Sequence, residues 1–77
     1  MIDQNDEYVI GNQNVGFAVI VASASTEREA RRLQRELSRD YFVEIGGKKI
    51  KAYYSVFRVL KGKASARIPI KHVEYVA

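Results

Sequence analysis

The first part of the chain places two short apolar runs around a polar turn. Residues 7–10 (EYVI) end at the Gly/Asn-rich residues 11–14, and residues 15–22 (VGFAVIVA) follow, rich in β-branched side chains. Two apolar runs on either side of such a turn are typical of a β-hairpin. The second run lacks clean polar alternation, so we expect a strand that lies inside the sheet and is buried on both faces.

A helical period replaces this pattern after residue 25. Thr26 begins a capping box, which predicts a helix with Thr26 as its N-cap that runs to about Arg39. At 3.6 residues per turn, Ala30, Leu33 and Leu37 fall on one stripe of this helix. Because the stripe is apolar, we expect it to face a sheet.

The period of two returns after the helix. Residues 41–45 (YFVEI) predict a strand that turns at residues 46–47 (GG), and residues 49–60 predict one long strand. Residues 66–76 predict a last strand, and Pro69 places it at an edge or beside a bulge because proline lacks a ladder donor. The predicted order is ββαβββ, an α+β fold with a single helix packed on a largely antiparallel sheet.

Length and composition restrict the class of protein. With 77 residues, of which 47% are hydrophobic and 29% charged, the chain is expected to form one globular domain. It has no cysteine, which excludes a disulfide framework and fits a reducing compartment. No apolar stretch approaches the roughly 20 residues that span a bilayer, and no secretory signal is visible. We therefore expect a cytoplasmic protein without membrane contact.

Charge is divided unevenly along the chain. Residues 1–14 carry three carboxylates and no Lys or Arg, whereas residues 15–77 carry all 13 Lys and Arg. We interpret residues 1–6 as an acidic N-terminal tail and residues 7–77 as a single basic α+β domain. A body this basic attracts nucleic acid or an acidic protein surface. Ordinary solubilising charge is the alternative interpretation.

Arginines are expected on the outer side of the helix, opposite the apolar stripe. This arginine ridge comprises Arg28, Arg32, Arg35 and Arg39, with Arg31 just beside them. A planar guanidinium binds phosphate or carboxylate through two parallel hydrogen bonds, so the ridge is our first candidate contact surface. The alternative is a solvated face held together by ion pairs between residues four positions apart.

Alternation along residues 49–61 separates a core face from a basic face. The expected core face comprises Ile50, Ala52, Tyr54, Val56 and Leu60. The other face carries Lys49, Lys51, Tyr53 and Phe57. Lysines interleaved with aromatic rings resemble a stacking platform for single-stranded nucleic acid. The alternatives are a minor apolar cluster under the acidic tail or a homodimer contact. We expect this face and the arginine ridge to lie on opposite sides of the molecule, as separate sites.

The sequence shows no local motif for catalysis or metal binding. His72 is the only histidine, and without cysteine it gives no recognisable zinc pattern. Residues 46–48 (GGK) lack the length and the Ser/Thr of a phosphate-binding loop, and no G-x-S-x-G elbow occurs. We therefore expect a non-enzymatic binding protein that uses no metal and no cofactor.

Residues 17–62 resemble the first half of a SPOR domain, the peptidoglycan-binding repeat of bacterial division proteins. Residues 17–21 (FAVIV) resemble its first strand, and residues 26–37 its helix. Residues 57–59 (FRV) with Gly62 resemble the Tyr-Arg-Val…Gly strand of the family. The resemblance implies glycan binding.

The chain departs from the SPOR pattern in three places. Ala22 replaces the glycine after the first strand, and Lys61 replaces an apolar residue. Residues 64–77 contain Pro69 and a β-rich ending where the second helix should follow. In size and style the chain also resembles small phage proteins that bind and block a host complex, which implies an inhibitor or adaptor. Three functions stay open: nucleic-acid binding first, protein binding second and glycan binding third.

Overall fold

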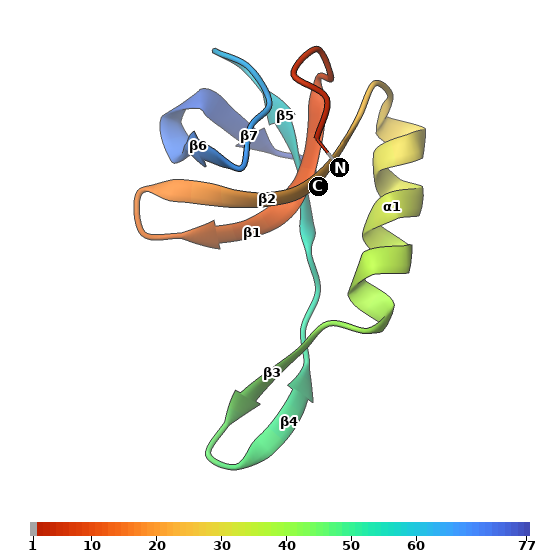
Figure 1. Ribbon diagram of the computed structural model, residues 1–77, viewed down its shortest axis with the longest axis vertical. Coiled ribbons are helices and arrows are strands. Elements are labelled where there is room, and N and C mark those ends of the chain that lie inside the picture. Colours follow the sequence, from red (N-terminus) through yellow and green to blue (C-terminus); the bar gives the residue numbers. More distant parts are fainter. Residues whose placement is uncertain (1) are drawn as a thin grey trace.

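The computed structural model describes residues 2–77 and contains one α-helix, a curled five-stranded sheet and a separate two-stranded hairpin (Figure 1). The elements in chain order are β1 (Tyr8–Asn14), β2 (Phe17–Ala24), α1 (Glu27–Arg39), β3 (Phe42–Ile45), β4 (Lys48–Lys51), β5 (Ser55–Val59), β6 (Arg67–Pro69), the 3-10 turn η1 (Ile70–His72) and β7 (Val73–Tyr75). The main sheet has the order β6-β2-β1-β5-β7, and its strand pairs are antiparallel. The predicted α+β class, with a helix packed on a largely antiparallel sheet, is confirmed.

The first hairpin forms as predicted, but its turn is shorter and later. β1 continues through the expected turn, and the chain reverses at Val15 and Gly16, where Gly16 has a φ of 76°. Gly11 lies buried inside the ladder, and a Cβ atom there would stand 2.0 Å from the carbonyl oxygen of Val19. This glycine therefore serves close approach of two backbones rather than a turn.

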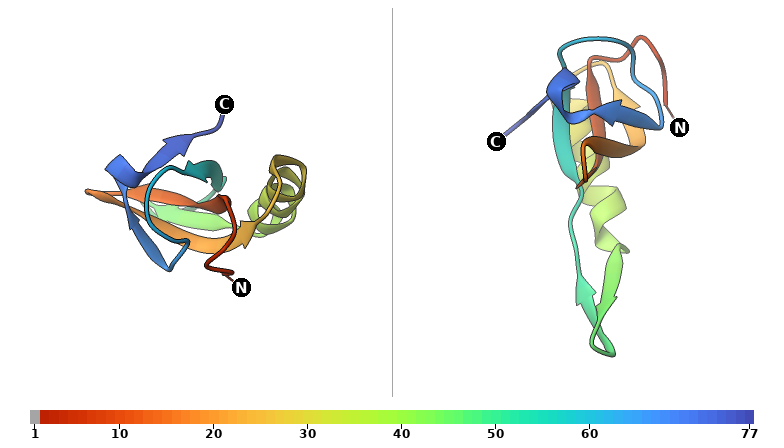
Figure 2. Two further views of the ribbon diagram at one scale, coloured as in Figure 1. Left: turned by 90° about the horizontal axis from the view of Figure 1, so that it is seen from above. Right: turned by 90° about the vertical axis from the view of Figure 1, so that its left-hand side faces the viewer.

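A β-bulge divides β2 between two hydrophobic clusters. Ile10 pairs with Ala22 but Gly11 pairs with Ile20, which leaves Val21 as the extra residue. The inner cluster, around which the sheet curls (Figure 2), contains Val9, Ala18, Ile20, Phe57, Ala64, Ile68 and Val73. The cluster under α1 contains Ile10, Ala22, Ala24, Ala30 and Val56. β2 therefore lies inside the sheet, as predicted, and contributes to both clusters.

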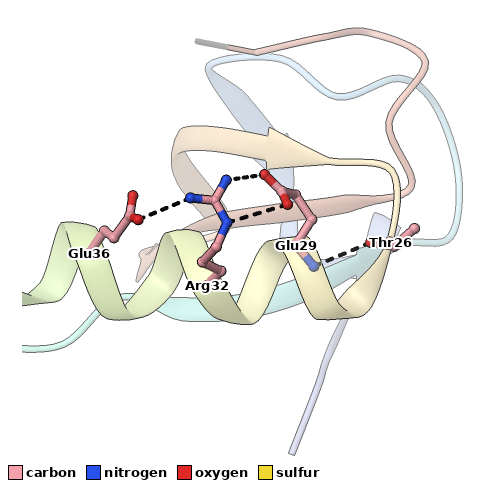
Figure 3. Close-up of polar contacts among 4 residues, drawn as sticks. All are labelled: Thr26, Glu29, Arg32 and Glu36. Atoms are coloured by element: carbon pink, nitrogen blue, oxygen red, sulfur yellow. Dashed lines mark hydrogen bonds and ion pairs between the residues drawn. The ribbon is translucent and has the colours of Figure 1, made fainter.

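Helix α1 begins and packs as predicted. Thr26 is its N-cap, and the hydroxyl Oγ1 accepts a hydrogen bond from the amide N–H of Glu29 at 3.2 Å (Figure 3). Ala30 is fully buried, and Leu33 and Leu37 are half-buried against the same cluster. The apolar stripe thus places the helix over β1, β2 and β5.

The prediction of a single long strand over residues 49–60 is wrong. β4 pairs with β3, β5 pairs with β1 and β7, and residues 52–54 between them belong to neither sheet. The β3–β4 hairpin turns at residues 46–47 as predicted and projects away from the main sheet (Figures 1 and 2). Because the two halves have different partners, the expected core face also fails at its ends, where Ile50 is 45% and Leu60 53% exposed.

The region of the predicted last strand contains two strands on opposite edges of the sheet. β6 pairs with β2 at one edge, and β7 pairs with β5 at the other. Pro69 ends β6 and leads into η1, after which the chain crosses to β7. The edge position expected for a proline-containing strand is confirmed, and this crossing encloses the inner cluster.

Candidate functional site

A groove of about 430 Å³ lies between the second half of α1 and the chain that leaves β4. Its lining residues are Gln34, Arg35, Ser38, Arg39, Lys51 and Tyr53. Three of these six side chains are cationic, and none of the six is acidic. The basic groove, as we name this set, combines two residues of the arginine ridge with two of the predicted stacking platform. The expectation that the two surfaces are separate sites is therefore wrong.

Two hydrogen bonds from α1 explain why these surfaces meet. Gln34 Nε2 donates to the carbonyl oxygen of Tyr54 at 2.7 Å, and the amide N–H of Tyr54 donates to Ser38 Oγ at 2.9 Å. Both backbone groups of Tyr54 are thus satisfied by the helix instead of by a neighbouring strand. The chain between β4 and β5 consequently runs along the side of α1, where Lys51 and Tyr53 lie close to the arginines.

Gln34 and Ser38 are the site residues that the sequence interpretation missed. They stand four positions apart on α1, so they lie on one side of the helix, next to the apolar stripe. Ser38 is only 3% exposed, whereas serine is mostly an exposed residue. Two polar residues at this spacing, adjacent to buried positions, were the signal in the sequence that another segment of the same chain packs there.

A stacked tyrosine pair fixes the base of the projecting hairpin. The rings of Tyr41 and Tyr54 lie nearly parallel, with centroids 4.2 Å apart. Asn12 Nδ2 donates to the hydroxyl of Tyr41 at 2.8 Å, and the amide N–H of Ala52 donates to the carbonyl of Tyr41 at 3.0 Å. Burial, together with the neighbouring Tyr41, raises the pKa of Tyr54 above its ordinary value.

Lys51 and Tyr53 form an exposed pair of a cation and an aromatic ring. Tyr53 is 69% exposed, and Lys51 Nζ lies 5.5 Å from the centroid of its ring. Lys49 lies on the same face of the hairpin as Lys51, with its Nζ 5.9 Å from the ring of Phe42. Lys49 is not in the groove lining, but it continues the positive surface along the hairpin.

Arg32, in the middle of the arginine ridge, is neutralised by its own helix. It forms ion pairs with Glu29 and, at 3.0 Å, with Glu36 (Figure 3). The hydrogen bond between Arg32 and Glu29 lowers the pKa of the Glu29 carboxyl and raises the pKa of the Arg32 guanidinium. Arg32 therefore fits the alternative interpretation of the arginine ridge, a solvated face held together by ion pairs.

Three further predicted site residues lie outside the basic groove. Arg28 is exposed on the first turn of α1, and Arg31 is half-buried and donates to the carbonyl oxygen of Ala77. Phe57 is only 4% exposed and belongs to the inner cluster, and its ring meets the ring of the exposed Tyr75 edge to face. The expectation of an exposed Phe57 platform is wrong because β5 is an inner strand with its Phe57 side turned into the curl of the sheet.

Comparison of the chain with known protein families, curated proteins and solved structures finds no match. Within residues 2–77, no group of three or more acidic or histidine side chains is arranged to hold a metal ion. Among the same residues, no helix has the length and apolarity needed to cross a bilayer. The interpretation of function therefore rests on the chemistry of the basic groove.

Proposed function

We propose that this chain is a non-enzymatic module that binds single-stranded nucleic acid in the basic groove. The proposal rests on the lining itself, in which Arg35, Arg39 and Lys51 share one groove with the exposed ring of Tyr53. Arginine forks bind phosphate oxygens in pairs, and lysine adds a point charge. An exposed tyrosine face stacks on any base, because every base has a π-face.

Charge outside the groove supports the same proposal. Lys49 extends the positive surface along the hairpin on the same face as Lys51, and the whole chain has a net charge of +4. The nearest acidic group in an ion pair with the groove is Asp40, 3.8 Å from Arg39, and both side chains are largely exposed. Such an exposed pair is weak, so it leaves Arg39 available to a phosphate.

Single strands suit the groove better than duplexes. A base in a duplex is covered on both faces by its neighbours, so Tyr53 has no face to contact there. A single strand presents unstacked bases, and each stacked base contributes about 1–3 kcal/mol. A duplex could use only the cations, through its phosphates.

Fluorescence anisotropy with labelled oligonucleotides tests the proposal. We expect binding to oligo-dT and oligo-U whose affinity falls with salt, with a slope of log K against log salt of roughly −2 for three phosphate contacts. Replacing Arg35 and Arg39 with Ala should abolish most of this binding. The matched control is Arg58→Ala with Lys71→Ala, which removes the same charge from exposed positions outside the groove. Absence of binding at low salt, or equal loss in the control, contradicts the proposal.

An acidic protein surface is the second candidate ligand, because guanidinium groups bind carboxylates with the same fork geometry as phosphates. Capture of a protein from nuclease-treated lysate that depends on Arg35 and Arg39, with no oligonucleotide binding, would favour an inhibitor or adaptor. Sedimentation with peptidoglycan glycan strands tests the SPOR-like alternative in the same set of variants.

A further inference from the structure

The β3–β4 hairpin has two chemically different faces. Its register pairs Val43 with Ile50 and Ile45 with Lys48, so these four residues share one face. The opposite face holds Phe42, Glu44, Lys49 and Lys51, which continue into the basic groove. The first set, named here the apolar hairpin face, has no role in the proposed nucleic-acid site.

The isoleucines of the apolar hairpin face are more exposed to water than is favourable for apolar side chains. Ile45 is 61% and Ile50 45% exposed. The hairpin extends away from both the main sheet and α1 (Figures 1 and 2). A two-stranded hairpin is marginally stable in water unless one face packs against something. Exposed apolar side chains on such an extension are typical of a contact surface.

A hollow of about 1040 Å³ lies elsewhere on the same chain, between the N-terminal segment, β2 and α1. Its apolar lining includes Ile2, Leu33 and Leu37, and its carboxylates are Asp3 and Asp6. Lys63 is the one basic residue among its lining residues. This acidic hollow is therefore apolar and negative, whereas the hairpin is apolar and positive.

The wall of the acidic hollow is held in place by Ser23. The hydroxyl of Ser23 donates to Asp6 Oδ2 at 2.8 Å and accepts from the amide N–H of Asp3 at 2.8 Å. The backbone of the N-terminal segment adds a turn in which the amide N–H of Asp6 donates to the carbonyl of Asp3 at 3.1 Å. Both carboxylates are thus kept at the edge of the hollow before any ligand arrives, which lowers the ordering cost of binding.

We propose that the apolar hairpin face of one copy docks in the acidic hollow of a second copy. Ile45 and Ile50 would cover Leu33 and Leu37, and Lys48 would meet the two carboxylates. Within one chain the hairpin points away from the body, so the occupant is another molecule. The contact leaves Lys49 and Lys51 free, so self-association and nucleic-acid binding are compatible and independent.

The form of the assembly follows from this contact. Hairpin and hollow are different surfaces, so each contact joins unlike surfaces of two copies. Reciprocal exchange between two copies closes a two-fold dimer, and one-way exchange extends an open chain. One hairpin face buries little area, and interfaces at the small end of the range are weak. We therefore expect concentration-dependent association that salt weakens, because part of it is charge attraction.

Cysteine cross-linking gives the sharpest test, because the chain has no native cysteine. One preparation carries Lys48→Cys on the hairpin, and the other carries Gln4→Cys in the lining of the hollow. Mixing them under mild oxidation should give a disulfide-linked heterodimer as the main product. The control replaces Gln4→Cys with Val15→Cys, an 89% exposed position in the turn between β1 and β2. Equal cross-linking to the control position, or none to Gln4→Cys, overturns the proposal.

Sedimentation equilibrium supplies an independent readout. The double variant Ile45→Asp, Ile50→Asp should associate at least tenfold more weakly than the unaltered chain, with an unchanged circular dichroism spectrum. The control Val15→Asp, which adds a negative charge at another exposed apolar position, should associate as the unaltered chain does. A chain that stays monomeric at every concentration overturns the proposal and leaves the hairpin face for a different protein.

Discussion

The buried hydroxyl of Ser38 accepts a hydrogen bond from the amide N–H of Tyr54 at 2.9 Å, which attaches the chain between β4 and β5 to α1. This contact turns what reads as one continuous strand into two strands of different sheets. It also carries Tyr53 from an expected sheet face to the side of Arg35 and Arg39. The shape of the basic groove therefore depends on this bond and on the bond from Gln34 to the carbonyl of Tyr54.

Replacing Ser38 with Ala should both destabilise the protein and damage the groove. The partly buried N–H of Tyr54 would lose its acceptor, and an unsatisfied donor that is fully buried costs about 1–3 kcal/mol, which sets the upper limit of the loss. Urea unfolding should show this loss, and oligonucleotide binding should weaken under conditions where the variant is still folded. Ser65→Ala, at an exposed serine whose hydroxyl donates to the carbonyl of Arg67, should change stability much less. Equal losses in the two variants would contradict the role given to Ser38.

Replacing Tyr53 with Ala should weaken single-strand binding and leave stability almost unchanged. The ring is 69% exposed, so little packing is lost, whereas each stacked base contributes about 1–3 kcal/mol. The expected effect in anisotropy is roughly 5- to 150-fold for oligo-dT and close to none for a duplex of the same length. Tyr53→Phe keeps the aromatic face and should bind as the unaltered chain does. A comparable loss in the Phe variant would show that the hydroxyl, not stacking, matters.

The parts of the fold that could be predicted are those decided by neighbours in sequence. The Thr26 hydroxyl caps the amide N–H of Glu29 three residues later, and the two glycines at residues 46–47 favour a tight turn. The stripe of Ala30, Leu33 and Leu37 required only the helical period. These expectations are confirmed because each depends on spacings of four residues or fewer.

The groove could not be predicted because it depends on contacts between distant residues. Period-two alternation gives no sign that residues 52–54 leave the sheet, since Ser38 and Gln34 draw them away from sixteen and twenty positions earlier in the chain. Phe57, which alternation placed beside Tyr53, is buried because the curled sheet encloses its side of β5, and this enclosure also depends on distant strands. Gly11 was assigned to a turn for a related reason. The sequence alone does not distinguish a glycine required for close approach of two backbones from a glycine required for a turn.

Replacing Gly11 with Ala should be among the most damaging single changes in the chain. The new Cβ atom would stand 2.0 Å from the carbonyl oxygen of Val19, and neither backbone can move without disturbing the β1–β2 ladder. Overpacking of this kind costs about 1–3 kcal/mol and sometimes more. Gly16→Ala is the matched control, because it meets open space and incurs only the cost of a φ of 76°, about 1–2 kcal/mol. Thermal unfolding of the two variants should therefore rank Gly11→Ala well below Gly16→Ala.

The ion pair of Arg32 and Glu29 should appear as a pH dependence of stability. The hydrogen bond from Arg32 lowers the pKa of Glu29 in the folded state, so the unfolded chain binds a proton at higher pH than the folded one does. The stabilisation is therefore present above the unfolded pKa of this carboxyl and is lost as the pH falls through the folded pKa. The effect is small and salt-sensitive, because both side chains are about half exposed.

Urea unfolding at neutral and acidic pH measures this contribution. The loss of stability on acidification should be smaller in Arg32→Gln than in the unaltered chain, and added salt should reduce the difference between the two proteins. Arg28→Gln removes the same charge from the first turn of α1 without touching the pair and should keep the acid loss of the unaltered chain. Because Arg32 lies outside the basic groove, Arg32→Gln should also bind oligonucleotides nearly as well as the unaltered chain does. A strong loss of binding in this variant would mean that the whole arginine ridge, and not the groove, contacts the ligand.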